Sequence, residues 1–213
     1  MDKYKIAYID EREEDRADFE RYAAEDFEIE LLEPTVDIND LVEDIFSGDI
    51  DAVITDFNLC EYNATIKYDG LDVVKQILAI RDNFPCFVLT SFDEDAAQHS
   101  EDVNVVYVKN EMNDNSGKLP FKERVRLQIM HYRKKLNDAK EEHLYLTELS
   151  NKQELDVALE SRLIELDNFI EKSLNKSAST PTAFKESHNA TKLSELIDST
   201  KELLKHLEDK GLC

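Results

Sequence analysis

Short apolar runs alternate with amphipathic segments through the first half of the chain. Five runs have the length and apolar content of buried strands, namely residues 4–9, 27–32, 52–55, 86–89 and 105–108. Between the first four of these runs, apolar side chains recur at helical spacing in residues 17–23, 38–46 and 71–80. Residues 93–102 offer only two alanines as apolar positions, so a fourth helix is expected to be short, mobile or absent. The alternation predicts an α/β fold whose parallel sheet is covered by helices on both faces.

The second half of the chain has the pattern of long helices. Apolar residues recur every three or four positions from residue 121 to 149, and a second stripe follows from residue 155 to 174. We expect the second helix to begin near Ser150 and Asn151, which are both good capping residues. A third amphipathic pattern occupies residues 191–211. Stripes of this kind must be buried, either in a helical bundle or against a second copy of the chain.

A polar, turn-rich stretch at residues 110–120 separates the two patterns, and the charge changes at the same place. Residues 1–117 hold 9 basic and 31 acidic side chains and so carry the whole net charge of −22, whereas residues 118–213 hold 17 of each sign. We therefore predict an α/β domain at 1–117. We predict a helical bundle or stalk for interaction or dimerisation at 118–213.

The excess of acid excludes whole classes of partner. A chain with 48 acidic and 26 basic side chains is repelled by nucleic-acid backbones and by anionic lipid surfaces. The locally basic residues are expected to be solvated or to dock on the acidic domain: Arg124, Arg126, Arg133, Lys134 and Lys135. No apolar run approaches the ~18 residues of a membrane span, and the three cysteines lack metal-ligand spacing. These features predict a cytoplasmic protein that binds neither nucleic acid nor membrane.

Polar side chains follow the predicted strands at the places where strands end. They are Asp10 and Glu11 after the first strand, Asp56 after the third, Thr90 and Ser91 after the fourth, and Lys109 after the fifth. Ligands of open parallel sheets bind beyond the carboxyl ends of the strands, so these groups are expected to converge. Hard carboxylate oxygens suit Mg²⁺, which bridges to phosphate oxygens. The pattern therefore predicts a metal-assisted phosphoryl site.

Taken in order along the chain, these segments resemble the receiver domain of two-component response regulators. The resemblance covers residues 1 to about 117. It is carried by Ile9-Asp10-Glu11, by the segment 53–59 around Asp56, by Asp69-Gly70-Leu71-Asp72, by Thr90 and by Lys109. The resemblance implies a doubly wound, flavodoxin-like parallel sheet of five strands in the order 2-1-3-4-5, followed here by the all-α extension.

The resemblance also implies a role for each site residue. Asp56 would be the phosphoacceptor, supplied by a histidine kinase or a small phosphodonor. Mg²⁺ would be held by Asp10, Glu11, Asp56 and the backbone carbonyl of Asn58. Thr90 and Lys109 would hold the phosphate oxygens and repack the loops behind them. Such a protein phosphorylates itself and loses the phosphate without turning over an external substrate, so it is not an enzyme in the ordinary sense.

The sequence departs from the family pattern in two places. The loop at residues 57–69 is several residues longer than usual, so it is expected either to cover the site as a lid or to be a tolerated surface insertion. The usual switch aromatic, three positions before the lysine, is Val106, and Tyr107 follows one place later. Because strand side chains alternate, Tyr107 is expected on the opposite side of the sheet, which puts its coupling to Thr90 in question.

Two other functions compete with a phospho-switch that signals to a protein effector, or to a second copy, through its C-terminal helices. The first is a pseudo-receiver, a scaffold that works without phosphorylation. The second is a phosphatase of the haloacid dehalogenase type, which carries a second aspartate two residues after its nucleophile, where this chain has Asn58. A DNA-binding output is disfavoured because the second half has no net charge and no short turn with a basic recognition helix.

Overall fold

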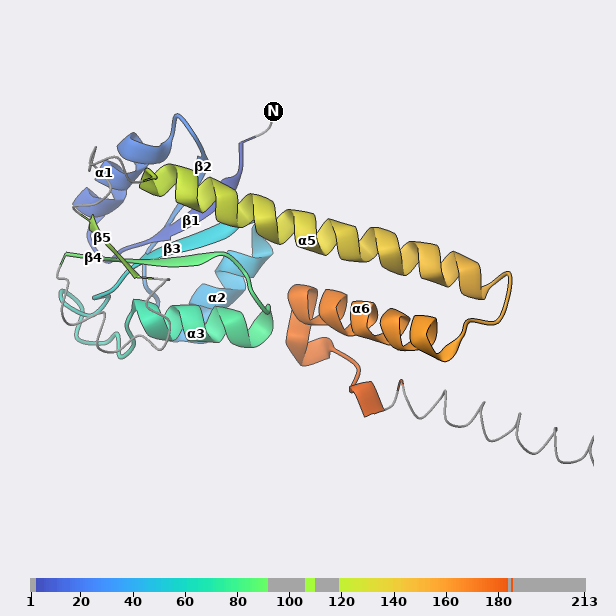
Figure 1. Ribbon diagram of the computed structural model, residues 1–213. Coiled ribbons are helices and arrows are strands. Elements are labelled where there is room, and N and C mark those ends of the chain that lie inside the picture. Colours follow the sequence, from blue (N-terminus) through green and yellow to red (C-terminus); the bar gives the residue numbers. More distant parts are fainter. Residues whose placement is uncertain (1–2, 92–105, 110–118, 184, 186–213) are drawn as a thin grey trace, which may run out of the picture. The chain divides into compact units, whose positions relative to one another are not determined.

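The computed structural model describes residues 3–91, 106–109, 119–183 and 185 (Figure 1). The N-terminal strands are β1 (Lys5–Ile9), β2 (Glu28–Leu32), β3 (Ala52–Asp56), β4 (Cys86–Thr90) and β5 (Val106–Val108). The helices are α1 (Glu13–Ala23), α2 (Ile38–Ser47), α3 (Gly70–Ile80), α5 (Phe121–Ser150) and α6 (Val157–Asn175), followed by the short 3₁₀ turn η3 (Lys176–Ala178). The predicted strands and the first three helices agree with these bounds to within a few residues.

The five strands form one parallel sheet in the order β2-β1-β3-β4-β5. The register places Ile9 beside Leu32 and Thr55, and Asp56 beside Leu89, so the strands end close to one common edge. The expected doubly wound sheet of order 2-1-3-4-5 is therefore confirmed. This edge receives the polar residues that follow each strand.

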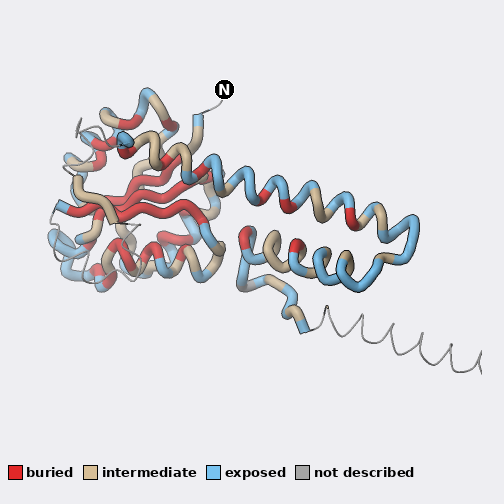
Figure 2. Tube along the Cα trace, viewed as in Figure 1, coloured by how far each residue is buried: buried red, intermediate tan, exposed pale blue. Residues whose placement is uncertain are grey.

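Helices cover both faces of the sheet because the central strands are apolar on both sides, as the buried strands in Figure 2 show. On one face, Ala7, Ile9 and Val53 pack against α2 and α3. On the other face, the alternate side chains pack against α1 and α5 in a second cluster: Ile6, Tyr8, Ile54, Phe87 and Leu89. Side-chain alternation along each strand therefore assigns every core residue to one of two layers.

Aspartate side chains cap the first turns of α2, α3 and α6. The carboxylate of Asp37 accepts a hydrogen bond from the Asn39 amide at 2.9 Å at the start of α2. Asp69 and Asp72 form a reciprocal capping box at the start of α3. The expected start of the second C-terminal helix near Ser150 and Asn151 is wrong. α5 ends at Ser150, and α6 is capped by Asp156, whose carboxylate accepts from the Leu159 amide at 2.8 Å.

The chain divides into two compact units, residues 1–138 and 139–213, with the division inside α5. The first half of α5 thus belongs with the sheet. Its basic residues dock on acids of the same unit, because Lys122 and Arg126 both bind Asp26 and Arg133 binds Asp51. The expectation that this basic cluster docks on the acidic domain therefore holds for Arg126 and Arg133. The predicted boundary at 117/118 adjoins residues outside the described part and stays a prediction.

The second unit is described as far as Lys185, apart from residue 184. The end of α5 and α6 enclose a small apolar cluster with Ala139, Leu146 and Leu166 buried. Arg162 of α6 binds both carboxylate oxygens of Glu142 of α5, at 2.8 and 2.6 Å. Apolar packing and one bidentate ion pair therefore hold the two helices together in this unit.

Several expectations fall on residues outside the described part of the chain. These are the fourth helix at 93–102, the turn-rich stretch at 110–118 and the third C-terminal helix at 191–211. Within the described residues, no helix is both long enough and apolar enough to cross a membrane. Cys60 and Cys86 are free thiols.

Candidate functional site

The strand ends gather four of the predicted side chains at the carboxyl edge of the sheet. Asp10 follows β1, Asp56 ends β3, Thr90 ends β4 and Lys109 follows β5. Asp10, Asp56 and Thr90 are buried, and Asp10 is fully inaccessible to solvent. The Lys109 side chain is 23% exposed. The ion pairs of Lys109 with Asp10 and Asp56 confirm that the charged groups of this set converge.

Lys109 lies at the centre of the site. Its ammonium is 2.6 Å from Oδ1 of Asp56, 3.2 Å from Oδ2 of Asp10 and 3.2 Å from Oδ2 of Asp15. An ammonium has three N–H donors, so three carboxylates can use all of them. Asp15, in the first turn of α1, was not among the residues that the sequence suggested. It stands in a run of three acids, Glu13-Glu14-Asp15, and no local signal distinguishes it from the other two.

Asp10 and Asp56 are held in place by neighbouring hydrogen bonds. Oδ2 of Asp10 accepts from the Tyr8 hydroxyl at 2.8 Å, and Oδ1 accepts from the Arg12 amide at 2.9 Å. Oδ2 of Asp56 accepts from the Asn58 amide at 2.7 Å. Each oxygen of both carboxylates therefore has a donor, which fixes the orientation of the two acids toward Lys109.

The electrostatics of the site follow from burial and from the charge of Lys109. Burial raises the pKa of Asp56 above its ordinary value, although the nearby Lys109 ammonium opposes that shift. Burial alone would lower the pKa of Lys109, but the carboxylates of Asp56, Asp10 and Asp15 outweigh it and raise that pKa. Lys109 is therefore charged at neutral pH and is the counter-ion of the buried acids.

Glu11 borders the same site and carries an unsatisfied atom. Its Oε2 is buried and has no hydrogen-bond partner among the described residues. Burial raises the pKa of Glu11 to about 7, and the charges of Asp10 and Asp56 add to the shift. Glu11 and Asp56 line a cavity of about 150 Å³, together with Asn58, Thr90 and Lys109. A small cation and a phosphoryl group are of the size that such a cavity admits.

The donor set of this cavity fits Mg²⁺ by its chemistry. The carboxylate oxygens of Glu11 and Asp56, which line the cavity, are hard ligands, and Oε2 of Glu11 has no hydrogen-bond partner among the described residues; Asp10 is buried just beside them. Among the described residues, however, no three His, Cys, Asp or Glu side chains form a ready cluster for a metal ion. The Lys109 ammonium lies between Asp10 and Asp56 instead, so the ligands exist and a cation already neutralises two of them.

Thr90 and Tyr107 lie on opposite sides of the sheet. Thr90 is two residues from Val88, which packs in the cluster with α2 and α3. Tyr107 packs in the other cluster, where its ring lies 5.3 Å from that of Phe121 and 5.8 Å from that of Phe87. The expected one-residue offset therefore places Tyr107 against α5 and away from Thr90, as strand alternation requires.

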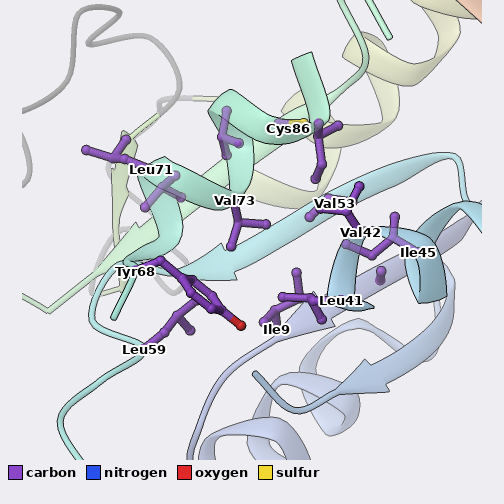
Figure 3. Packing of buried hydrophobic residues seen from close by; sticks show 14 of the residues in the cluster. Ile9, Leu41, Val42, Ile45, Val53, Leu59, Tyr68, Leu71, Val73 and Cys86 are labelled. Atoms are coloured by element: carbon purple, nitrogen blue, oxygen red, sulfur yellow. The ribbon is translucent and has the colours of Figure 1, made fainter. Parts of the chain in front are cut away.

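The long loop between β3 and α3, Phe57–Asp69, is fastened to the core by three buried side chains. Leu59, Ile66 and Tyr68 belong to the cluster with α2 and α3, and Figure 3 shows Leu59 and Tyr68 lying near Ile9 and Leu41. The Tyr68 hydroxyl also donates to the Thr35 carbonyl at 2.6 Å. The loop is thus packed on the domain, and Phe57, Asn58 and Glu61 line the cavity.

The raised pKa of Glu11 predicts how stability depends on pH. Between the ordinary value of 4.5 and about 7, the folded chain binds a proton that the unfolded chain has lost. The free energy of unfolding should therefore fall as pH rises through this window, in buffer without divalent ions. Urea titrations from pH 4.5 to 7.5 should show a shallower slope for Glu11→Gln than for the wild type. Equal slopes would contradict the prediction, and Glu14→Gln, an exposed neighbour, is the matched control.

Comparisons with known proteins give matches among solved structures only. No protein-family model matches the chain. No curated protein matches it either. The anti-anti-sigma factor PhyR from Bartonella quintana matches with 14% identity and a TM-score of 0.48, over 66% of this chain and 52% of that chain. This chain thus spans about half the length of that protein.

Two receiver structures are also similar. A response regulator receiver protein from Sinorhizobium medicae WSM419 has 18% identity and a TM-score of 0.43, over 61% of this chain and 93% of that one. The receiver domain of nitrogen regulatory protein C has 19% identity and a TM-score of 0.44, over 62% and 99% respectively. The likeness is distant, so the strand order and the site residues of this chain itself support the assignment to an open, doubly wound fold.

Proposed function

We propose that the N-terminal unit is a phospho-switch of the two-component type, in which Asp56 accepts a phosphoryl group. The observation that carries this proposal is the Lys109 ammonium, 2.6 Å from Asp56 and 3.2 Å from Asp10 at the carboxyl edge of a 2-1-3-4-5 sheet. A carboxylate held next to a fixed cation, in a cavity of about 150 Å³, is positioned to become an acyl phosphate. The phosphodonor is a histidine kinase or a small acyl phosphate.

The chemistry requires only groups that the site contains and one cation. An oxygen of Asp56 attacks phosphorus, the bond from phosphorus to the leaving group breaks, and the leaving group departs with the electron pair. Asp10, Glu11, Asp56 and the Asn58 carbonyl would hold a Mg²⁺ ion, which would supply the positive charge that the transferring group needs. Lys109 and the Thr90 hydroxyl hold phosphoryl oxygens. Water later hydrolyses the aspartyl phosphate, so the cycle turns over no external substrate.

The helical second unit is proposed to carry the output to a protein, either an effector or a second copy of the chain. Leu144 and Tyr145 of α5 are 60% and 63% exposed, and Leu174 of α6 is 46% exposed. Exposed large apolar side chains on this unit are surfaces that a protein partner can bury, whereas nucleic acid would need basic ones. The excess of acid in the whole chain opposes nucleic-acid binding as well.

The proposal is tested by the intact mass after incubation with acetyl phosphate and Mg²⁺. We expect the wild type to gain one phosphoryl group and Asp56→Ala to gain none, because Asp56 is the nearest of the three carboxylates that pair with Lys109 and it lines the cavity. Asp44→Ala, which removes an exposed acid from α2, is the matched control and should gain the same increment as the wild type. Omitting Mg²⁺ should abolish or greatly slow the gain.

Two results would contradict the proposal. If neither the wild type nor Asp44→Ala gains mass, the chain is not a phospho-switch, and a scaffold that works without phosphorylation becomes the better hypothesis. If Asp56→Ala still gains one phosphoryl group, another side chain is the acceptor and the assignment of Asp56 is wrong.

A further inference from the structure

Asp15 gives Lys109 a third carboxylate partner that comes from a helix instead of a strand end. Its Oδ2 is 3.2 Å from the ammonium, the same distance as Oδ2 of Asp10. With Asp56 closer still, the three donors of Lys109 are all engaged. A phosphoryl group on Asp56 that takes Lys109 as its counter-ion must therefore draw it away from a partner. Asp15 is the most exposed of the three, at 29%, so its ion pair is the weakest to hold.

Asp15 also faces a second cation. Nη1 of Arg12 is 3.8 Å from its Oδ2, and the Arg12 guanidinium lies over the Tyr62 ring, 5.6 Å from the ring centre. The carboxylate of Asp15, followed by the Tyr62 hydroxyl, raises the pKa of Arg12 above its ordinary value. Arg12 thus connects the acid that binds Lys109 to a residue of the 57–69 loop.

Tyr62 is the outward end of this connection. Its side chain is 65% exposed, while Leu59 and Ile66 on either side of it are buried in the core. The loop is therefore anchored at both sides of an exposed aromatic residue. A cation above an aromatic ring interacts with the face of that ring. A change in the position of Arg12 would therefore change the environment of the Tyr62 side chain.

We propose that Asp15 is a positioning residue that links Lys109 to Arg12 and so transmits the state of Asp56 to Tyr62. The proposal deepens the proposed function, since a phosphoryl group on Asp56 is what draws Lys109 from Asp15. Once Lys109 turns to the phosphoryl oxygens, Asp15 keeps Arg12 as its remaining cation and pulls it closer. Arg12 then shifts relative to the Tyr62 ring, and the surface of the 57–69 loop differs between the two states.

The chain contains no tryptophan, so Tyr62→Trp introduces a single fluorescent reporter above Arg12. In this background, Lys109→Gln removes one of the two cations that Asp15 pairs with and leaves it Arg12. We expect Lys109→Gln to shift the tryptophan emission when Asp15 is present and to leave it unchanged when Asp15→Asn is present. Asp18→Asn removes the same charge from α1, where Asp18 pairs with Arg21, and should leave the effect of Lys109→Gln intact.

Acetyl phosphate and Mg²⁺ provide the second arm, with the mass of each sample measured in parallel. We expect phosphorylation to shift the emission of the Tyr62→Trp protein and to leave the Asp15→Asn variant of that protein unshifted. If Lys109→Gln does not fold, as judged by circular dichroism, this arm decides the question without it.

The outcomes separate the two proposals. The link through Asp15 is overturned if Lys109→Gln leaves the tryptophan emission unchanged. It is also overturned if Lys109→Gln shifts the emission equally with and without Asp15. A phosphoryl increment without any emission shift overturns the link as well. If the dependence on Asp15 is seen but no sample gains mass, the link through Asp15 stands and the phosphorylation of Asp56 is the proposal that fails.

Discussion

Gly70→Ala is expected to lower the free energy of unfolding by about 2–4 kcal/mol. A Cβ atom on Gly70 would lie 2.1 Å from the carbonyl oxygen of Asp56 and 3.0 Å from its carbonyl carbon. Both are backbone atoms at the end of a central strand, so neither can rotate away as a side chain would. The gain from a less flexible unfolded chain, about 0.4–1 kcal/mol, is too small to offset this clash.

Urea denaturation followed by circular dichroism measures the effect, and Gly48→Ala is the matched control. A Cβ on Gly48 would meet the carboxylate end of Glu30 at 3.2 Å and the side chain of Ile50 at 3.3 Å, and both can shift. We expect the control to change stability by less than about 1 kcal/mol. Equal stabilities for the two variants would show that the backbone at the end of β3 can move to make room for the added Cβ. The site would then be less rigid than the contact between Gly70 and Asp56 indicates.

Lys109→Gln is expected to lower the free energy of unfolding by about 2–3 kcal/mol at neutral pH. It leaves Asp56, Asp10 and Asp15 facing one another without their shared cation. The expected value lies below that for a fully buried pair because the side chains of Lys109 and Asp15 are 23% and 29% exposed. Asp56 and Asp10 are close enough to repel, because the charge of Asp10 adds to the burial that raises the pKa of Asp56.

The loss of stability caused by Lys109→Gln should be largest at neutral pH and smaller in acid. The pKa of Lys109 is raised above its ordinary 10.5, so its stabilising effect is complete at neutral pH and is lost only in strong alkali. In acid the Asp56 carboxylate, whose pKa is raised by burial, takes up a proton and no longer needs a cation, so the stability difference between wild type and variant should become smaller. Urea titrations at pH 7.5 and pH 3.5 check this.

Lys75→Gln is the matched control for the Lys109 variant. Lys75 pairs with Asp72 on the surface of α3, with both side chains well exposed, and its loss should cost less than about 0.5 kcal/mol at either pH. The difference in unfolding free energy between the wild type and Lys109→Gln could instead be as large in acid as at neutral pH. That result would mean that packing of the lysine stem, and not its charge, stabilises the site.

The order of the elements and most of the acid site follow from the sequence alone. Strands and helices leave periods of two and about 3.6 residues in the chain, and those periods are local properties that a sequence displays directly. Asp10, Asp56, Thr90 and Lys109 could be placed together because they follow strand ends, and strand ends of an open parallel sheet share one edge. The start of α6 was misplaced because Ser150 and Asp156 are both good caps, and local propensity does not choose between them.

Only the tertiary structure selected Asp15 from its run of three acids. Asp15 and Lys109 are 94 residues apart in the chain, and their contact depends on how α1 packs on β1 and β2 and on the reach of the Lys109 side chain. The same holds for the 57–69 loop, whose length suggested either a lid or a surface insertion until the burial of Leu59, Ile66 and Tyr68 fixed it on the core. Periodicity tells which face of an element is apolar, but the rotation and docking of one element against another set which polar side chains meet.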